Sequence, residues 1–234
     1  MSLHPVRALS FDLDETLWSL DQVIERAEAD MAAFFWEHYP KVTERFDRAA
    51  MLDFRREVLR RDPSIAHDFG ELRLRTLRLA TDACGYPPEA ARRALEVFLA
   101  GRNRVRLFDE TRPTLERLRS RYPLVALTNG NADVQRIGIG HYFNVSISAA
   151  QVGAAKPAPE MFEAVTRALS LQPEQTAHVG DDPETDVLGA ARFGMRAVWL
   201  NRQGAPWPRE LPQVDYLEIK SLSELHTLLP EEDV

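Results

Sequence analysis

The sequence of 234 residues is long enough for one large domain, or for a domain that carries a sizeable insertion. Apolar residues make up 44% and charged residues 28% of the chain, the proportions of an ordinary soluble globular protein, which argues against disorder of the whole chain. The formal net charge of −7 repels nucleic-acid phosphates, so nucleic acid is not expected as a partner.

The chain has a single cysteine, Cys84, which cannot form an internal disulfide, as is usual in a reducing compartment. No segment reaches the roughly 18 consecutive apolar residues of a membrane span. The first residues also lack the charged start and apolar stretch of a secretory signal. These features predict a cytoplasmic protein with no membrane partner. A monomer or a homodimer is expected, and the sequence does not decide between them.

The first predicted element is a buried strand at residues 6–11, a short apolar run between Pro5 and a group of acidic residues. Residues 21–101 then show apolar residues at helical spacing and predict a succession of helices. Their expected ends are marked by Pro63, Gly85 and Gly101. A helical block is therefore expected as an insertion directly after the first strand.

After the helical block the pattern changes to alternating strands and helices. Strands are predicted at 124–127, 145–147, 177–179 and 197–200, and helices at 115–121, 161–169, 187–193 and 221–229. This alternation is typical of a parallel sheet with helices on both faces. The prediction is an α/β protein with two domains, a core of residues 1–20 and 102–234 and a helical domain of residues 21–101.

Polar side chains gather where the predicted strands end, which is where an open parallel sheet places its ligands. Each of them alone would be an ordinary turn or cap residue. Together they place carboxylates, a hydroxyl and an amine at successive strand ends or in the adjacent loops: Asp12, Asp14, Thr128, Asn129, Lys156, Asp181, Asp182 and Asp186.

These residue types suit the transfer of a phosphoryl group. Asp12 and Asp14 are two residues apart, so in an extended chain they lie on one side, where one can attack phosphorus and the other can handle protons. Carboxylates of Asp12, Asp181 and Asp186 are oxygen ligands that suit Mg²⁺. Lys156 adds a positive charge that such a group of acids needs.

The four motifs, in this order, resemble those of the haloacid dehalogenase-like hydrolase superfamily. The resemblance covers essentially the whole chain and implies a Rossmann-like core with an inserted helical cap at residues 21–101. It implies that Asp12 is a nucleophile that forms an aspartyl-phosphate and that Asp14 is the general acid and base. Thr128 and Asn129 would bind the phosphate, Lys156 would stabilise its oxygens, and Mg²⁺ would be held by Asp12, the Asp14 carbonyl, Asp181 and Asp186.

Asp14 separates subfamilies, because the dehalogenases proper lack this second aspartate. Its presence favours a phosphoric monoester hydrolase that acts on small phosphorylated metabolites. The segments at 123–131, 178–182 and 185–187 most resemble bacterial phosphatases of flavin mononucleotide and of the phosphoribitylaminouracil intermediate of riboflavin biosynthesis. A phosphatase of a sugar phosphate, phosphoglycolate or a nucleotide is the alternative, and a phosphate-sensing protein without catalysis is another.

Trp18 and His178 lie next to the motifs, and each could either take part in the site or be packed in the core. Trp18 follows the first motif, so it is expected to line the site and to contact the substrate, with packing inside the core as the other interpretation. His178 lies in a predicted strand, where a histidine is expected to be packed and hydrogen-bonded rather than catalytic.

Overall fold

The structure of the protein is a computed structural model that describes Leu3 and residues 5–229. The chain forms two compact units. The first contains the residues up to Ser19, Arg106–Asn129 and the residues from Asp133 onward, and the second contains Leu20–Val105 with Gly130–Ala132. Each unit has its own hydrophobic core.

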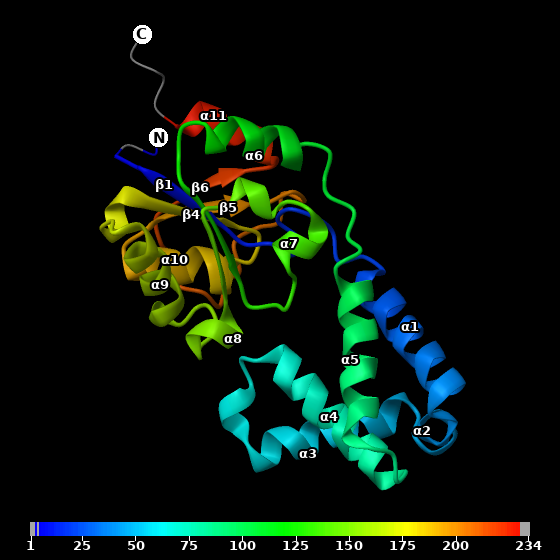
Figure 1. Cartoon of the computed structure of the whole chain (residues 1–234). Helices are drawn as coiled ribbons and strands as arrows, with labels where there is room; N and C mark the ends of the chain where they lie inside the picture. Colours follow the sequence, from blue (N-terminus) through cyan, green and yellow to red (C-terminus); the bar gives the residue numbers. More distant parts are fainter. Residues whose placement is uncertain (1–2, 4, 230–234) are drawn as a thin grey trace. The chain divides into compact units, whose positions relative to one another are not determined.

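The first unit is built on six parallel strands, as Figure 1 shows in part. Their order across the sheet is β3-β2-β1-β4-β5-β6. The strands are β1 (Ala8–Phe11), β2 (Leu124–Thr128), β3 (Val145–Ser148), β4 (Thr176–Gly180), β5 (Arg196–Leu200) and β6 (Tyr216–Ile219). The predicted α/β class with a parallel sheet is confirmed. Because β1 lies between β2 and β4, the carboxyl ends of these three strands are neighbours.

Strand β6 was not predicted from the sequence. It lies at the edge of the sheet and pairs only with β5 among the described strands. Ile219 is buried in it and Glu218 is exposed, while Tyr216 and Leu217 are half-buried. An edge strand of four residues with mixed polarity lacks the continuous apolar run by which the central strands are recognised.

Helices cover both faces of this sheet (Figure 1). Helices α9 (Pro159–Leu169) and α10 (Gly189–Phe193) pack on one face, where Phe162 and Met161 belong to a buried cluster with residues of β2, β3 and β5. Helices α6 (Thr111–Arg119) and α11 (Leu225–Leu228) lie on the other face. The short helices α7 (Val134–Ile137) and α8 (Ala149–Val152) connect strands.

Two predicted helices have a different form in the structure. The helix expected at 187–193 begins earlier, as a π-helical segment at Pro183–Leu188 that continues into α10. The helix expected at 221–229 is a 3₁₀ turn at Leu222–Glu224 followed by α11. Widening of a first turn to the π form places Asp186 inside the turn, and such turns are frequent at functional sites.

The second unit consists of helices: α1 (Val23–His38), α2 (Pro40–Arg45), α3 (Arg48–Arg61), α4 (Phe69–Ala83) and α5 (Pro88–Arg102). Asp47 and Asp68 cap α3 and α4 by accepting backbone N–H groups. One buried cluster joins the helices through residues such as Phe35, Leu77 and Phe98. Within the described part of the chain, no helix combines the length and the apolar composition needed to cross a membrane.

Candidate active site

The site begins at the end of β1, where the chain leaves the sheet. Asp12 follows this strand directly, and its backbone N–H donates to the carbonyl of Val179 in β4 at 2.9 Å. The chain then makes a tight turn, closed by a hydrogen bond from the N–H of Leu17 to the carbonyl of Leu13 at 2.8 Å. Glu15 within the turn has a φ of 57°. The first motif is thus held by the sheet on one side and by its own turn on the other.

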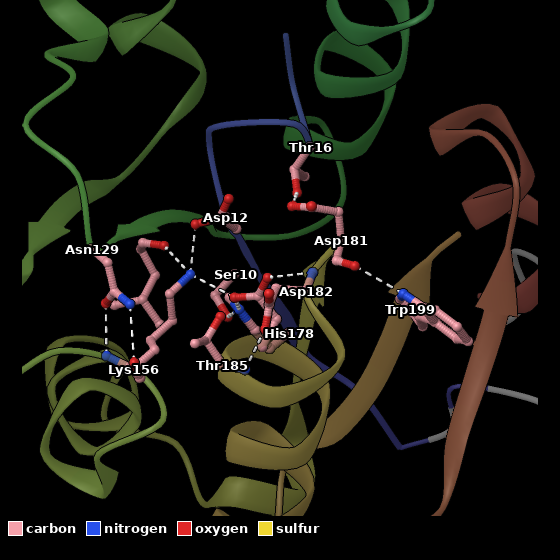
Figure 2. A network of polar contacts seen from close by, with 12 residues as sticks. Ser10, Asp12, Thr16, Asn129, Lys156, His178, Asp181, Asp182, Thr185 and Trp199 are labelled. Carbon is pink, nitrogen blue, oxygen red and sulfur yellow. Dashed lines mark hydrogen bonds and ion pairs between the residues drawn. The ribbon is translucent and has the colours of Figure 1, made fainter. Parts of the chain in front are cut away.

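Lys156 lies at the centre of the polar network (Figure 2). Its Nζ is 2.6 Å from Oδ1 of Asp12 and 2.6 Å from Oδ1 of Asp186, and it donates to the carbonyl of Leu127 at 3.0 Å. Burial alone would lower the pKa of Lys156, but the two carboxylates outweigh burial and raise it. The ammonium therefore stays charged, and it holds the two acids on either side of it.

The side chain of Asn129 fixes the loop that carries this lysine. Its Nδ2 donates to the backbone carbonyl of Lys156 at 3.0 Å, and its Oδ1 accepts from the N–H of Lys156 at 2.6 Å. Thr128 ends β2 beside it and is buried. Both Thr128 and Asn129 are predicted from the sequence to bind the phosphate group. The structure uses the amide of Asn129 to hold the loop that carries Lys156.

The acidic residues after β4 divide into two roles. Asp181 points to the first motif, and its Oδ1 accepts from the hydroxyl of Thr16 at 3.1 Å. Its backbone carbonyl accepts from Nε1 of Trp199 at 2.8 Å. Asp182 instead caps the following turn, where its Oδ1 accepts from the N–H groups of Glu184 and Thr185. The sequence left this division open, and the structure assigns Asp181 to the site.

Asp186 and His178 form the buried floor of the site. Oδ1 of Asp186 lies 3.1 Å from Nε2 of His178, and Oδ2 accepts from the N–H of Asp182 at 3.1 Å. Nδ1 of His178 lies 2.8 Å from the hydroxyl of Ser10. Burial raises the pKa of Asp186, but Lys156 and then His178 outweigh it and hold the pKa below its usual range. Burial lowers the pKa of His178, which is packed and hydrogen-bonded as predicted.

The donor set fits a divalent cation. Asp12, Asp181 and Asp186 each offer a carboxylate oxygen, and these atoms lie within 4.8 Å of one another. Burial, followed by Asp186 and Asp14, raises the pKa of Asp12 although Lys156 opposes this. Burial and then Asp186 raise the pKa of Asp181 to about 7. The single positive charge of Lys156 does not neutralise the negative charges of three clustered carboxylates. A bound cation would do so, and carboxylate oxygens are ligands that suit Mg²⁺.

The excess of carboxylates over positive charges at the site predicts how the stability of the metal-free protein depends on pH. Since the pKa of Asp181 rises from 3.8 to about 7 on folding, the folded state binds more protons than the unfolded state between these values. Asp181 therefore lowers the free energy of unfolding as pH rises through this window, by a few kcal/mol at most (about 1.4 per pKa unit). Ligation of Mg²⁺ by the ionised site would recover this stability.

The measurement is thermal unfolding in a chelator from about pH 4 to pH 8, for the wild type and for Asp181→Asn. The lowered pKa of His178 acts in the opposite sense, because its stabilising contribution grows as pH rises toward 6.5. The difference between the two proteins isolates Asp181. We expect the wild type to lose stability relative to the variant as pH rises. A constant difference would contradict the raised pKa.

Trp18 occupies a place other than the predicted substrate contact. Its side chain is fully buried, and Nε1 donates to Oδ1 of Asp14 at 2.9 Å. The indole is therefore packed in the interior, which was the other interpretation of this residue. A buried ring offers no open face for stacking on a substrate, so the stacking role is replaced by a contact with an acid of the site.

Three contributors were not singled out in the sequence: Ser10, Thr16 and Gly180. Ser10 lies inside β1, and Thr16 belongs to the first motif. Gly180 ends β4, and a Cβ at this position would come within 2.5 Å of the Cβ of Asp186 and closer still to its carboxyl group. A glycine directly before an acidic motif at a strand end is the one signal that could have indicated this close approach.

Comparisons with known proteins place the chain in a family. Residues 6–194 match the model of the haloacid dehalogenase-like hydrolases. The chain is 33% identical over 235 residues to the 5-amino-6-(5-phospho-D-ribitylamino)uracil phosphatase YigB of Escherichia coli (strain K12), covering 97% of this chain and 98% of that protein. A solved structure of a 2-haloacid dehalogenase from Pseudomonas syringae pv. Tomato DC3000 has a TM-score of 0.90, 38% identity, and coverage of 95% and 97%.

A second solved structure, of an HAD phosphatase from Thermococcus onnurineus, has a TM-score of 0.68 and 29% identity, with coverage of 98% of this chain and all of that one. The chain therefore belongs to the haloacid dehalogenase-like hydrolases, as its motifs predicted. Within this family it is an enzyme of the phosphoric monoester hydrolase class.

Proposed function

We propose that the protein hydrolyses phosphate monoesters with Mg²⁺ and through a phosphorylated Asp12. The observation that carries this proposal is the ion pair of Lys156 with Asp12, next to the cluster of Asp12, Asp181 and Asp186. It combines a carboxylate at a strand end, a fixed ammonium and a set of oxygen ligands. These are the parts that phosphoryl transfer to a side chain requires.

The proposed reaction has two steps. A carboxylate oxygen of Asp12 forms a bond to phosphorus while the bond from phosphorus to the ester oxygen breaks, and Asp14 gives its proton to the departing oxygen. The oxygen of a water molecule then forms a bond to phosphorus while the bond from phosphorus to the Asp12 oxygen breaks, and Asp14 takes a proton from that water. Inorganic phosphate leaves and Asp12 is restored. Lys156 holds Asp12 in place and, with the hydroxyl of Thr128, binds oxygens of the phosphoryl group.

The bound Mg²⁺ would offset the negative charge of the phosphoryl group against the acids. Asp12 and Asp181 would hold it, together with the backbone carbonyl of Asp14. Asp186 was predicted as a further ligand. Its Oδ1 is shared by Lys156 and His178, and its Oδ2 accepts from a backbone N–H, so we propose that it acts mainly by holding Lys156.

The two kinds of relative suggest different chemistry, and Asp14 decides between them. A dehalogenase of this family acts without a second aspartate and without metal, as the resemblance implies. This chain has Asp14 and a three-acid cluster, so phosphate esters are the better supported substrates. The similarity to the ribitylaminouracil phosphatase along nearly the whole chain favours that metabolite or flavin mononucleotide as the substrate.

The test is the release of phosphate from a set of esters, with Mg²⁺ and with a chelator. The set contains flavin mononucleotide, the phosphoribitylaminouracil, phosphoglycolate and a sugar phosphate. We expect activity in chelator to fall to about a hundredth or less and to return with Mg²⁺. We also expect the ribityl substrates to have the highest kcat/KM.

Each contrary result has a distinct meaning. Full activity in chelator would remove Mg²⁺ from the mechanism. A higher kcat/KM for phosphoglycolate or the sugar phosphate would remove the riboflavin-pathway substrate and keep the phosphatase. Release of chloride from 2-chloropropionate, without phosphatase activity, would assign the protein to the dehalogenases instead.

A further inference from the structure

Trp18 is bonded to the first motif in a way that its sequence position does not reveal. Its Nε1 donates to Oδ1 of Asp14 at 2.9 Å, and its backbone forms a bridge with that of Asp14. The indole is fully buried, and a buried indole N–H normally requires an acceptor. The acceptor here is the carboxyl group to which the reaction assigns the proton transfer.

The backbone of Leu17 and Trp18 is bonded to the segment that returns to the same unit. Trp18 forms an antiparallel bridge with Leu107, and the carbonyl of Leu17 accepts from the N–H of Phe108 at 3.1 Å. The same carbonyl accepts from the hydroxyl of Thr111 at 2.8 Å. Trp18 is thus a hydrogen-bond donor whose position is fixed within the first unit. Its acceptor, Asp14, lies in a tight turn that contains Glu15 in the left-handed region.

The chemistry of the indole determines what this contact does. An indole nitrogen can only donate a hydrogen bond, in either protonation state of its partner. Oδ1 of Asp14 therefore accepts from the indole, which leaves Oδ2 as the oxygen that this contact does not engage. A rigid donor on one oxygen also fixes the rotation of the carboxyl group. Proton transfer depends on such geometry, because the acid must lie within hydrogen-bond reach of the departing oxygen.

We propose that Trp18 is a positioning residue for Asp14, which holds its carboxyl group in the orientation needed to reach the leaving group. This role rests on the proposed phosphatase mechanism and adds to it a residue that touches no substrate. It differs from a packing role, because the N–H of the ring matters in addition to the apolar area. Removal of the Trp18 N–H should therefore lower kcat for esters whose leaving group needs a proton to depart.

The experiment compares Trp18→Phe with wild type in the full-length protein with Mg²⁺. Phenylalanine keeps a buried ring and removes the N–H. We expect kcat for an alkyl phosphate to fall about 10- to 100-fold, since small displacements of a reacting group have effects of this size. KM should change less than about twofold, and the first-step burst with p-nitrophenyl phosphate, whose leaving group needs little protonation, should fall much less.

Trp207→Phe is the matched control. The Nε1 of Trp207 is buried and has no hydrogen-bond partner within the described residues, and its ring stacks on Tyr216 at 4.8 Å. This variant removes an indole N–H without removing a hydrogen bond, so it should keep kcat. A second comparison introduces Trp18→Phe into Asp14→Ala. A positioning role predicts no further loss there, because the partner is already absent.

The alternatives separate clearly. Equal losses for the alkyl and aryl esters, or a further loss in the Asp14→Ala background, would overturn the positioning role. An inactive wild type would overturn the proposed function itself. If Trp18→Phe does not fold, NMR of the indole N–H decides the question in proteins that keep Trp18: its resonance should shift between wild type and Asp14→Ala. An unchanged resonance would overturn the contact.

Discussion

Asp12→Asn is expected to reduce kcat by at least about a thousandfold, the scale of losses measured for catalytic groups that act as a unit. The asparagine has nearly the same shape, so the buried position remains filled. It lacks the charge that attacks phosphorus and pairs with Lys156, whose Nζ is 2.6 Å from Oδ1 of Asp12. The measurement is steady-state phosphate release with Mg²⁺, together with a search for the phosphorylated protein by mass spectrometry.

The control for this substitution is Asp53→Asn, the same change at an exposed position in α3. Asp53 pairs with Arg56 at the surface, and such pairs contribute little to stability. It should keep full activity. A folded Asp12→Asn that retains more than about a tenth of the wild-type activity would show that Asp12 is not the nucleophile.

The second large effect is expected for Gly180→Ala, a change of one methyl group. The new Cβ would lie within 2.5 Å of the Cβ of Asp186 and closer to its carboxyl carbon, which real Cβ atoms do not tolerate. Asp186 is held by Lys156, His178 and the N–H of Asp182, so it cannot move without breaking these contacts. We expect kcat to fall at least about a hundredfold, since small displacements near reacting groups have effects of this size.

This substitution should also lower the melting temperature, because overpacking usually costs about 1–3 kcal/mol. Gly70→Ala serves as its control. Gly70 lies in α4 of the helical unit, and the nearest atom to its Cβ would be Oδ1 of Asp68 at 3.3 Å. That variant should keep its activity. Unchanged kcat and melting temperature in Gly180→Ala would contradict the close packing of Asp186.

The central part of the fold was accessible from the sequence because it rests on short-range patterns. Strands β1, β2, β4 and β5 are buried on both faces, so each shows an almost unbroken apolar run. The residues at their ends were expected to converge, since a parallel sheet brings its carboxyl ends to one edge. Lys156 and Asp12, which are 144 residues apart, meet there as an ion pair.

The roles of individual site residues depend on where their side chains point, and the spacing of residues in the sequence does not determine this. Asp181 and Asp182 are adjacent acids, and only the turn that follows shows that Asp182 caps backbone N–H groups while Asp181 faces Asp12. Trp18 was equally ambiguous, because a tryptophan after a catalytic motif could face the substrate or the interior. Its hydrogen bond to Asp14 follows from a turn with a left-handed residue, Glu15, which a sequence pattern does not predict.

The bridge between Trp18 and Leu107 has a consequence for how such a chain can change during evolution. It joins the points at which the polypeptide departs from the catalytic unit, after Ser19, and re-enters it, at Arg106. The residues between these positions act as one long loop of the first unit, and the bridge holds the two ends of this loop together. The entropic cost of closing a loop grows only slowly with its length. A recombination event at these two sites would exchange the helical segment as a module and leave Asp12, Lys156 and Asp181 encoded as before.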